Sequence, residues 1–334
     1  MKKILAMTLC IAMTVSLLVG CSSGGEAVKT GLAVVSSLGK SANATADAEG
    51  LAQTDSLIAA VLVDKNGKIL DCKIDAAQTK IKFSAEGKLT TDVASTFKTK
   101  NELGTEYGMA SASGIGKEWY EQAAAFAKYC VGKTVDEVKG IAVNGEGIPG
   151  DADLAASVTI HIGDYIEAVA QAAGAATDKG AKKGDKLGLA ITTDISKSSD
   201  ATADAEGLAQ SYSNIAVVTL NKDSKITSCI IDAIQGNVNF SATGEISTDL
   251  TAAPQTKQVL KDSYGMKKAS AIGKEWYEQA DAFAAYCVGK TTEAVKGIAL
   301  TDDGKAADAD LAASVTVHVG PFIANVEKAA AAAK

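Results

Sequence analysis

The chain has no arginine, so all 33 of its basic residues are lysines, and it has two histidines. Without arginine, the bidentate guanidinium fork that commonly binds free phosphates and carboxylates is missing. A phosphate group would have to be held by lysine, by backbone amides or by a covalent bond. The net charge of −7 argues against binding of nucleic acid, or of an anionic membrane surface, through charge.

Residue clusters that bind metals or perform hydrolysis are also missing from the sequence. It has no Cys-x-x-Cys pair and no histidine cluster, which disfavours a zinc site. His161 and His318 lie one in each half, without a serine or cysteine nucleophile at a recognisable spacing. We interpret both as polar-face residues, and a hydrolytic enzyme is the least supported class of function.

The first 20 residues predict export from the cytoplasm. Two lysines precede an uncharged apolar run, which is the pattern of a secretory signal peptide and is shorter than the about 20 apolar residues of a membrane-spanning helix. The run ends in Leu-Val-Gly-Cys21, which resembles the lipobox of bacterial lipoproteins. This resemblance implies lipidation of Cys21, an anchor on the extracytoplasmic face of the cell membrane and a Ser- and Gly-rich tether at 21–30. An ordinary signal peptide with an incidental cysteine is the alternative.

The rest of the chain consists of two copies of one domain of about 140 residues, which we call the first and second repeats. Three segments recur at a constant offset of 157 positions: 44–53 at 201–210, 115–122 at 272–279, and 151–159 at 308–316. A period this long indicates a duplicated domain and not a solenoid of short units. We expect the domains at 31–173 and 187–330, joined by a solvated linker at 174–186 that is rich in Gly, Ala and Lys.

The first half of each repeat predicts strands. Residues 57–64 and 68–75 are apolar, β-rich runs that meet at Asn66-Gly67, and Asn-Gly is a strong hairpin signal. Residues 80–84 predict a third strand. These runs favour antiparallel pairing of neighbouring strands.

Helices follow the strands. Residues 116–131 show helical spacing of apolar side chains, and Thr134 begins a capping-box pattern for a short helix. The stretch after Ser157 fits either a strand or a helix, and Pro321 in the second repeat favours a helix that begins there. Strands followed by helices predict an α+β fold with a mostly antiparallel sheet in each repeat.

Four cysteines lie outside the export signal, two in each repeat: Cys72 and Cys130, then Cys229 and Cys287. A location outside the cytoplasm would permit a disulfide within each repeat. Cys72 also fits the apolar face of a strand, and Cys130 the apolar face of a helix, where a free cysteine packs as a small hydrophobe. Both interpretations remain open at this point.

One nine-residue segment suggests a cofactor. The sequence Asp151-Ala-Asp-Leu-Ala-Ala-Ser157-Val-Thr159 recurs with Asp308, Ser314 and Thr316 at the same places. It resembles the flavinylation motif of the FMN-binding domain family, in which a flavin transferase joins FMN by a phosphoester to the hydroxyl at the seventh position. Ser157 and Ser314 occupy that position. The segment departs from the family pattern where Leu-Ala replaces Ser-Gly in both repeats.

The resemblance implies a fold, a cofactor and a role. Each repeat would be an FMN-binding-domain-like unit with one covalent FMN, and the anchored protein would carry electrons from a membrane reductase to external acceptors. Trp119 and Trp276 are the aromatic candidates to pack on the flavin, although the helical spacing of Trp119 favours a place in the core. Ser157 equally fits a residue that caps or ends a helix. The alternative function is a cofactor-free surface lipoprotein that binds a small molecule or a protein partner.

Overall fold

The structure is a computed structural model that describes residues 25–334. The signal peptide predicted at 1–20 and the lipidation predicted at Cys21 lie outside the described residues. Within residues 25–334, none of the helices has the length and apolar character needed to span a bilayer.

The strands of the described chain form two antiparallel sheets, ordered β3-β2-β1-β4 and β5-β6-β7. Their bounds are β1 Ala27–Ser37, β2 Gly50–Val63, β3 Ile69–Phe83, β4 Thr177–Lys182, β5 Lys186–Asp194, β6 Gly207–Leu220 and β7 Ile226–Phe240. The turn between β2 and β3 contains Gly67 at φ 78°, a left-handed conformation that suits glycine.

The helices follow the strands in each repeat. In the first repeat they are α1 Lys100–Leu103, the 3₁₀ helix η1 Gly104–Tyr107, α2 Trp119–Cys130, α3 Val135–Lys139, α4 Ala152–Ala155 and α5 Gly163–Gly174. In the second they are α6 Lys257–Leu260, η2 Lys261–Tyr264, α7 Trp276–Cys287, α8 Thr292–Lys296, α9 Ala309–Ala312 and α10 Gly320–Ala332.

Strand β2 explains how the layers are arranged, because both of its faces are buried. Leu57 and Ala59 belong to a core shared with the helices of their own repeat. Their neighbours Ile58 and Ala60 pack against residues of the second repeat. Side chains alternate along a strand, so one face of β2 meets helices and the other meets the second sheet. The near-continuous apolar sequence of this strand follows from burial on both sides.

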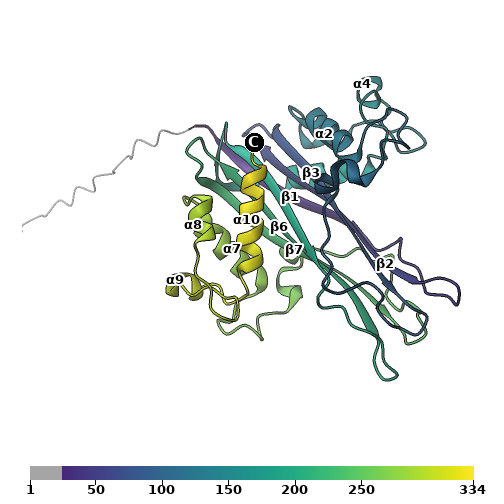
Figure 1. Ribbon diagram of the computed structural model, residues 1–334. Coiled ribbons are helices and arrows are strands. Elements are labelled where there is room, and N and C mark those ends of the chain that lie inside the picture. Colours follow the sequence, from purple (N-terminus) through teal and green to yellow (C-terminus); the bar gives the residue numbers. More distant parts are fainter. Residues whose placement is uncertain (1–24) are drawn as a thin grey trace, which may run out of the picture.

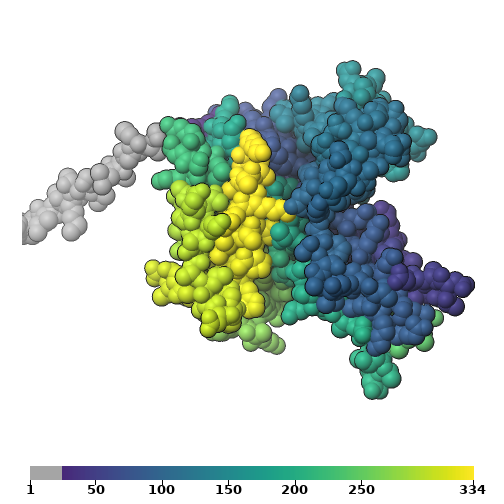
Figure 2. Space-filling view, in the orientation of Figure 1, coloured from purple at the N-terminus to yellow at the C-terminus, as the bar shows by residue number. Residues whose placement is uncertain are grey.

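The two sheets therefore pack on each other, with each repeat's helices on the outside. Figure 1 shows the helices of the two repeats on opposite sides of the pair of sheets. Figure 2 shows α10, in yellow, against the first repeat, where Lys328 Nζ pairs with Glu102 Oε1 at 2.7 Å. The repeats share a buried core and form one body.

The inter-sheet contact has approximate twofold symmetry. Phe83 and Phe240, equivalent residues of the two repeats, stack at 4.2 Å between ring centroids with an interplanar angle of 10°. A Cβ on Gly50 would collide with the ring of Phe83, and one on Gly207 would collide with Phe240. The recurring Glu-Gly-Leu-Ala sequence thus contains the glycine that lets each ring lie against its own sheet.

Backbone hydrogen bonds follow the same symmetry. Ala44 N donates to Gly244 O at 2.8 Å, and its equivalent Ala201 N donates to Gly87 O at 2.8 Å. Such reciprocal contacts are those of an isologous dimer interface, here formed between two halves of one chain.

The α+β fold with antiparallel sheets is confirmed, as are the hairpin at Asn66-Gly67 and the proline in the first turn of α10. The segment 174–186 differs from the expected solvated linker, because 177–182 form β4, which pairs with β1 at the edge of the first sheet. Residues 27–30, expected in the tether, belong to β1. Residues 80–84 do not make a separate strand, since β3 continues to Phe83.

The four body cysteines are free and buried. Burial raises the pKa of the Cys130 thiol to about 12 and that of Cys72 well above its ordinary value. Cys72 and Cys130 are therefore neutral thiols, and all four cysteines are core residues, as packing on a strand and a helix predicted.

Candidate functional site

The segment with the flavinylation-like sequence forms a short helix, α4, and the turn after it. Asp151 caps the helix, because its Oδ1 accepts a hydrogen bond from Leu154 N at 3.0 Å. Leu154 and Val158 are buried in the core of the first repeat. Asp308 caps α9 in the same way at 2.9 Å. The aspartates thus have a structural role in both repeats.

Thr159 also has a structural partner. Its backbone N–H donates to Gln122 Oε1 at 2.8 Å, and its hydroxyl lies 3.3 Å from the same oxygen. Gln122 is fully buried, and its amide nitrogen donates to Ser113 Oγ and Lys117 O. Thr316 and Gln279 repeat this contact at 2.8 Å. The amide of Gln122 therefore joins the motif segment to the start of α2.

The serines differ from the rest of the motif. Ser157 is partly exposed, and its hydroxyl has no hydrogen-bond partner among the described residues. Ser314 Oγ donates to Leu311 O at 3.5 Å. The Ser157 hydroxyl is therefore free to react or to bind a ligand, unlike the side chains of Asp151 and Thr159.

A cavity of about 750 Å³ lies in the first repeat, beside the end of this segment. It is bounded by the helix-covered face of the sheet, by α1 and η1, by the start of α2 and by the residues that precede and begin α5. Charged and aromatic side chains line it, among them Lys40, Asp55, Lys100, Tyr107, Trp119 and Tyr165. Thr159 and His161 contribute to the same wall.

Lys100 and two aromatic rings form one part of this cavity. Lys100 Nζ lies 4.6 Å from the ring centroid of Tyr107 and 5.2 Å from that of Trp119, within the range of cation–π attraction. Trp119 is 3% exposed, and its Nε1 donates to Tyr165 Oη at 2.6 Å. Trp119 is therefore a fixed core residue that also borders the cavity.

Asp55 and Asp164 are the carboxylates that line the cavity, and Asp55 is held by three side chains. Its carboxylate accepts hydrogen bonds from Gln78 Nε2 at 2.8 Å and Gln53 Nε2 at 2.9 Å, and pairs with Lys40 Nζ at 3.1 Å. Burial by itself acts to raise the pKa of Asp55. The hydrogen bonds and charge of the three donors outweigh this effect, so the pKa of Asp55 lies below its ordinary value. Asp55 is therefore ionised at neutral pH.

The second repeat has the same lysine and rings but a different neighbour. The residues equivalent to Lys100, Tyr107 and Trp119 are Lys257, Tyr264 and Trp276, and Tyr212 takes the position of Asp55. Lys257 Nζ lies 4.5 Å from the ring centroid of Tyr212. It lies 4.3 Å from that of Tyr264 and 4.9 Å from that of Trp276. Lys257 is 4% exposed, and its Nζ donates to Tyr212 Oη at 2.8 Å. Burial lowers the pKa of Lys257 to about 7, partly offset by the charge of Asp232.

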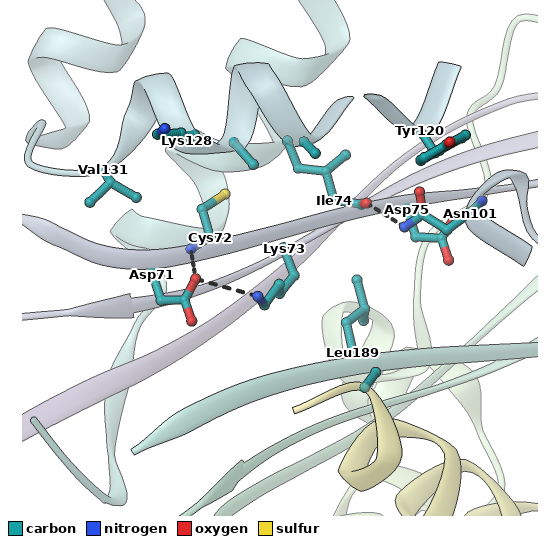
Figure 3. Close-up of a pocket in the computed structure, with 13 residues that line it drawn as sticks. Asp71, Cys72, Lys73, Ile74, Asp75, Asn101, Tyr120, Lys128, Val131 and Leu189 are labelled. Atoms are coloured by element: carbon teal, nitrogen blue, oxygen red, sulfur yellow. Dashed lines mark hydrogen bonds and ion pairs between the residues drawn. The ribbon is translucent and has the colours of Figure 1, made fainter. Parts of the chain in front are cut away.

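A smaller cavity, of about 420 Å³, lies where α2 and β3 of the first repeat meet Leu189 and Ala332 of the second. Figure 3 shows Asp75 beside Asn101, whose side-chain amide donates to Ile74 O at 2.9 Å. Asp75 Oδ1 accepts from Asn101 N at 3.1 Å, while burial raises its pKa to about 6. Since its backbone donors satisfy Asp75, we interpret this cavity as a packing gap between the repeats.

The structure brings together only some of the residues singled out from the sequence. Trp119 and Thr159 line the larger cavity with His161, which is exposed, whereas Ser157 and Asp151 are not among its lining residues. Trp276 is buried, with its ring 5.6 Å from Phe322. His318 is exposed, like His161.

Sequence reasoning missed Lys100, Tyr107 and Asp55. A signal for them existed, because the lysine, tyrosine and tryptophan recur in both repeats at one spacing, while the position of Asp55 changes to tyrosine. These features are visible in the aligned repeats, but they lie among many other positions that are identical in both.

Within residues 25–334 there is no group of three or more His, Cys, Asp and Glu side chains arranged to hold a metal ion. Comparisons with models of protein families, with curated proteins and with solved structures found no match for this chain.

Proposed function

We propose that the chain is a binding protein whose first repeat takes up a small molecule in the cavity beside Lys100. The observation that carries this proposal is the cavity itself, which combines a volume of about 750 Å³ with a lysine held over two aromatic rings. Small-molecule sites commonly occupy about 300–1,000 Å³ and combine apolar and aromatic walls with a few convergent polar groups. Lys40, Asp55 and Tyr165 supply such groups here.

Comparison with the second repeat supports placing the binding site in the first repeat alone. In the second repeat the equivalent lysine is buried and hydrogen-bonded to Tyr212, so its amino group already has a partner within the protein. Lys100 is partly exposed and faces a cavity. The two repeats thus share a fold but differ in what they offer to a ligand.

A ligand-detected NMR screen of small aromatic and anionic compounds against residues 25–334 tests the proposal. We expect some compounds to bind, and their binding signals should weaken with the Lys100→Met variant. This substitution removes the ammonium and keeps an apolar side chain of similar length. Lys257→Met is the matched control and should leave the hits unchanged. A screen without hits, or hits equally sensitive to both substitutions, would contradict binding in this cavity.

A second candidate function is the flavin-dependent electron carrier that the motif suggests. Two observations favour it in the first repeat: the Ser157 hydroxyl has no partner among the described residues, and Thr159, two residues later, lines the cavity. Ser157 would hold FMN through a phosphoester, with Trp119 at the cavity wall. The bound FMN would supply the redox chemistry, and Cys21 would keep the carrier at the membrane near its reductase.

The second repeat fits FMN less well. Ser314 Oγ contacts Leu311 O, and Tyr212 covers the lysine beside Trp276. The flavin candidate is therefore one FMN on Ser157, and not one in each repeat as the sequence suggested.

Co-expression with a flavin transferase tests this second candidate. Intact-protein mass should increase by one FMN phosphoester, and the increase should disappear in Ser157→Ala but persist in Ser314→Ala. An unmodified protein, or modification that survives Ser157→Ala, would contradict it.

A further inference from the structure

The two repeats together indicate the chemical class of the ligand. Resting on the proposed binding function, we infer that the cavity of the first repeat accepts an aromatic ring that carries an oxygen atom, because the phenol of Tyr212 occupies the equivalent place in the second repeat. The second repeat would thus contain, as one of its own side chains, a counterpart of the ligand that the first repeat binds.

The positions are equivalent in the sheets as well as in the sequence. Asp55 pairs with Ser37 across β1 and β2, and Tyr212 pairs with Asp194 across β5 and β6. The offset of 157 relates both members of each pair. The two side chains therefore leave their sheets at the same point of the fold, beside the equivalent lysines Lys100 and Lys257.

The contacts of Tyr212 define what the site recognises. Its hydroxyl oxygen accepts a hydrogen bond from Lys257 Nζ at 2.8 Å, and the same nitrogen lies 4.5 Å from the centroid of its ring. A phenol thus satisfies this lysine through both its oxygen and its ring. With the tyrosine in place, the lysine is 4% exposed.

In the first repeat, the residue at the same point is engaged elsewhere. The Asp55 carboxylate is held by Gln53, Gln78 and Lys40, and no hydrogen bond or ion pair joins it to Lys100 among the described residues. Lys100 keeps its two aromatic neighbours but lacks the phenol, and a cavity lies there instead. The missing partner is a flat ring with a hydroxyl or carbonyl oxygen that accepts from Lys100 Nζ.

A phenol probe tests the inference. p-Cresol is the tyrosine side chain without its backbone, and toluene has nearly the same shape without the oxygen. We expect p-cresol to bind residues 25–334 about tenfold or more tightly than toluene in a titration followed by NMR, because a hydrogen bond from a charged donor discriminates by that factor. Lys100→Met should reduce p-cresol binding to the level of toluene.

Two substitutions at the equivalent positions complete the test. Asp55→Tyr should place a phenol over Lys100 and abolish p-cresol binding in the first repeat, whereas Tyr212→Ala should create a second p-cresol site beside Lys257. If other fragments bind beside Lys100 while p-cresol does not, the inference is overturned and the binding function stands. If no fragment binds there, both fail. Equal affinity for p-cresol and toluene would overturn the requirement for an oxygen.

Discussion

The buried lysine of the second repeat gives a prediction about stability and pH. Burial lowers the pKa of Lys257 to about 7 from an ordinary value of 10.5. Between these two values the unfolded chain binds more protons than the folded chain, so the free energy of unfolding rises with pH. Below pH 7 both states hold the proton, and the contribution of Lys257 becomes constant.

The magnitude follows from proton linkage. A full proton difference changes the free energy of unfolding by about 1.4 kcal/mol per pH unit. Since Lys257 is half titrated at pH 7 in the folded state, its contribution should increase by about 1.6 kcal/mol between pH 7 and pH 8.5. Lys257→Met removes the titrating group and fits the same aromatic surroundings, so the variant should lack this increase.

Urea unfolding of residues 25–334 and of the variant, at pH 7 and pH 8.5, measures the effect. The difference in unfolding free energy between the two proteins cancels the titration of shared groups that do not interact with Lys257, such as the cysteines of the first repeat. The titration of Asp232, whose charge raises the pKa of Lys257, does not cancel and is part of the measured effect. Lys100→Met is the matched control, because it removes the partly exposed lysine of the first repeat. A difference between wild type and Lys257→Met that stays constant over this pH range would refute the reasoning.

Three further predictions concern the packing that holds the repeats and the motif segment. Phe83→Ala should lower the unfolding free energy by about 3–5 kcal/mol, since the ring is fully buried against Phe240, and a loss below about 1 kcal/mol in urea unfolding would contradict an essential inter-sheet contact. Gln122→Ala should lower the unfolding free energy by about 1–3 kcal/mol in the same assay, because Thr159 N–H loses its acceptor. An unchanged unfolding free energy would contradict a stabilising role for this hydrogen bond. Cys130, whose pKa burial raises to about 12, should react with Ellman's reagent only after unfolding, and rapid reaction of the native protein would contradict a buried neutral thiol.

Local patterns in the sequence predicted the hairpin, the capped helices and the duplicated α+β units. Asn66-Gly67 and Thr134 act through neighbouring residues alone, so their effects can be identified without a structure. The offset of 157 positions similarly made the duplication visible. Helical spacing placed Cys130 and Trp119 on one face, where both are buried.

Contacts between the repeats could not be predicted in the same way. The pairing of β4 with β1 brings 177–182 back to the start of the first repeat, and no local pattern marks such a return. The stacking of Phe83 on Phe240 depends on two sheets that meet only in the folded chain. The 174–186 segment looked like a linker because its side chains are small or charged, although its backbone completes a sheet.

The candidate site likewise combines features that the sequence predicted with contacts that it did not. The motif at 151–159 attracted attention as a linear pattern, yet hydrogen bonds give Asp151 and Thr159 structural roles. The cavity collects residues from β1, β2, β3, α1, η1, α2 and α5, which are distant in the sequence. Lys100 can be identified as a candidate binding residue only from its position beside Tyr107 and Trp119 in the folded chain.

The most direct test of ligand binding in the first repeat is a map of backbone amide chemical shifts during titration with p-cresol. Binding in the proposed cavity predicts shift changes concentrated at 100–107 and 159–165, with the equivalent segments 257–264 and 316–322 unchanged. Changes of equal size in both repeats, or changes confined to segments outside the cavity, would contradict the assignment of the site to the first repeat.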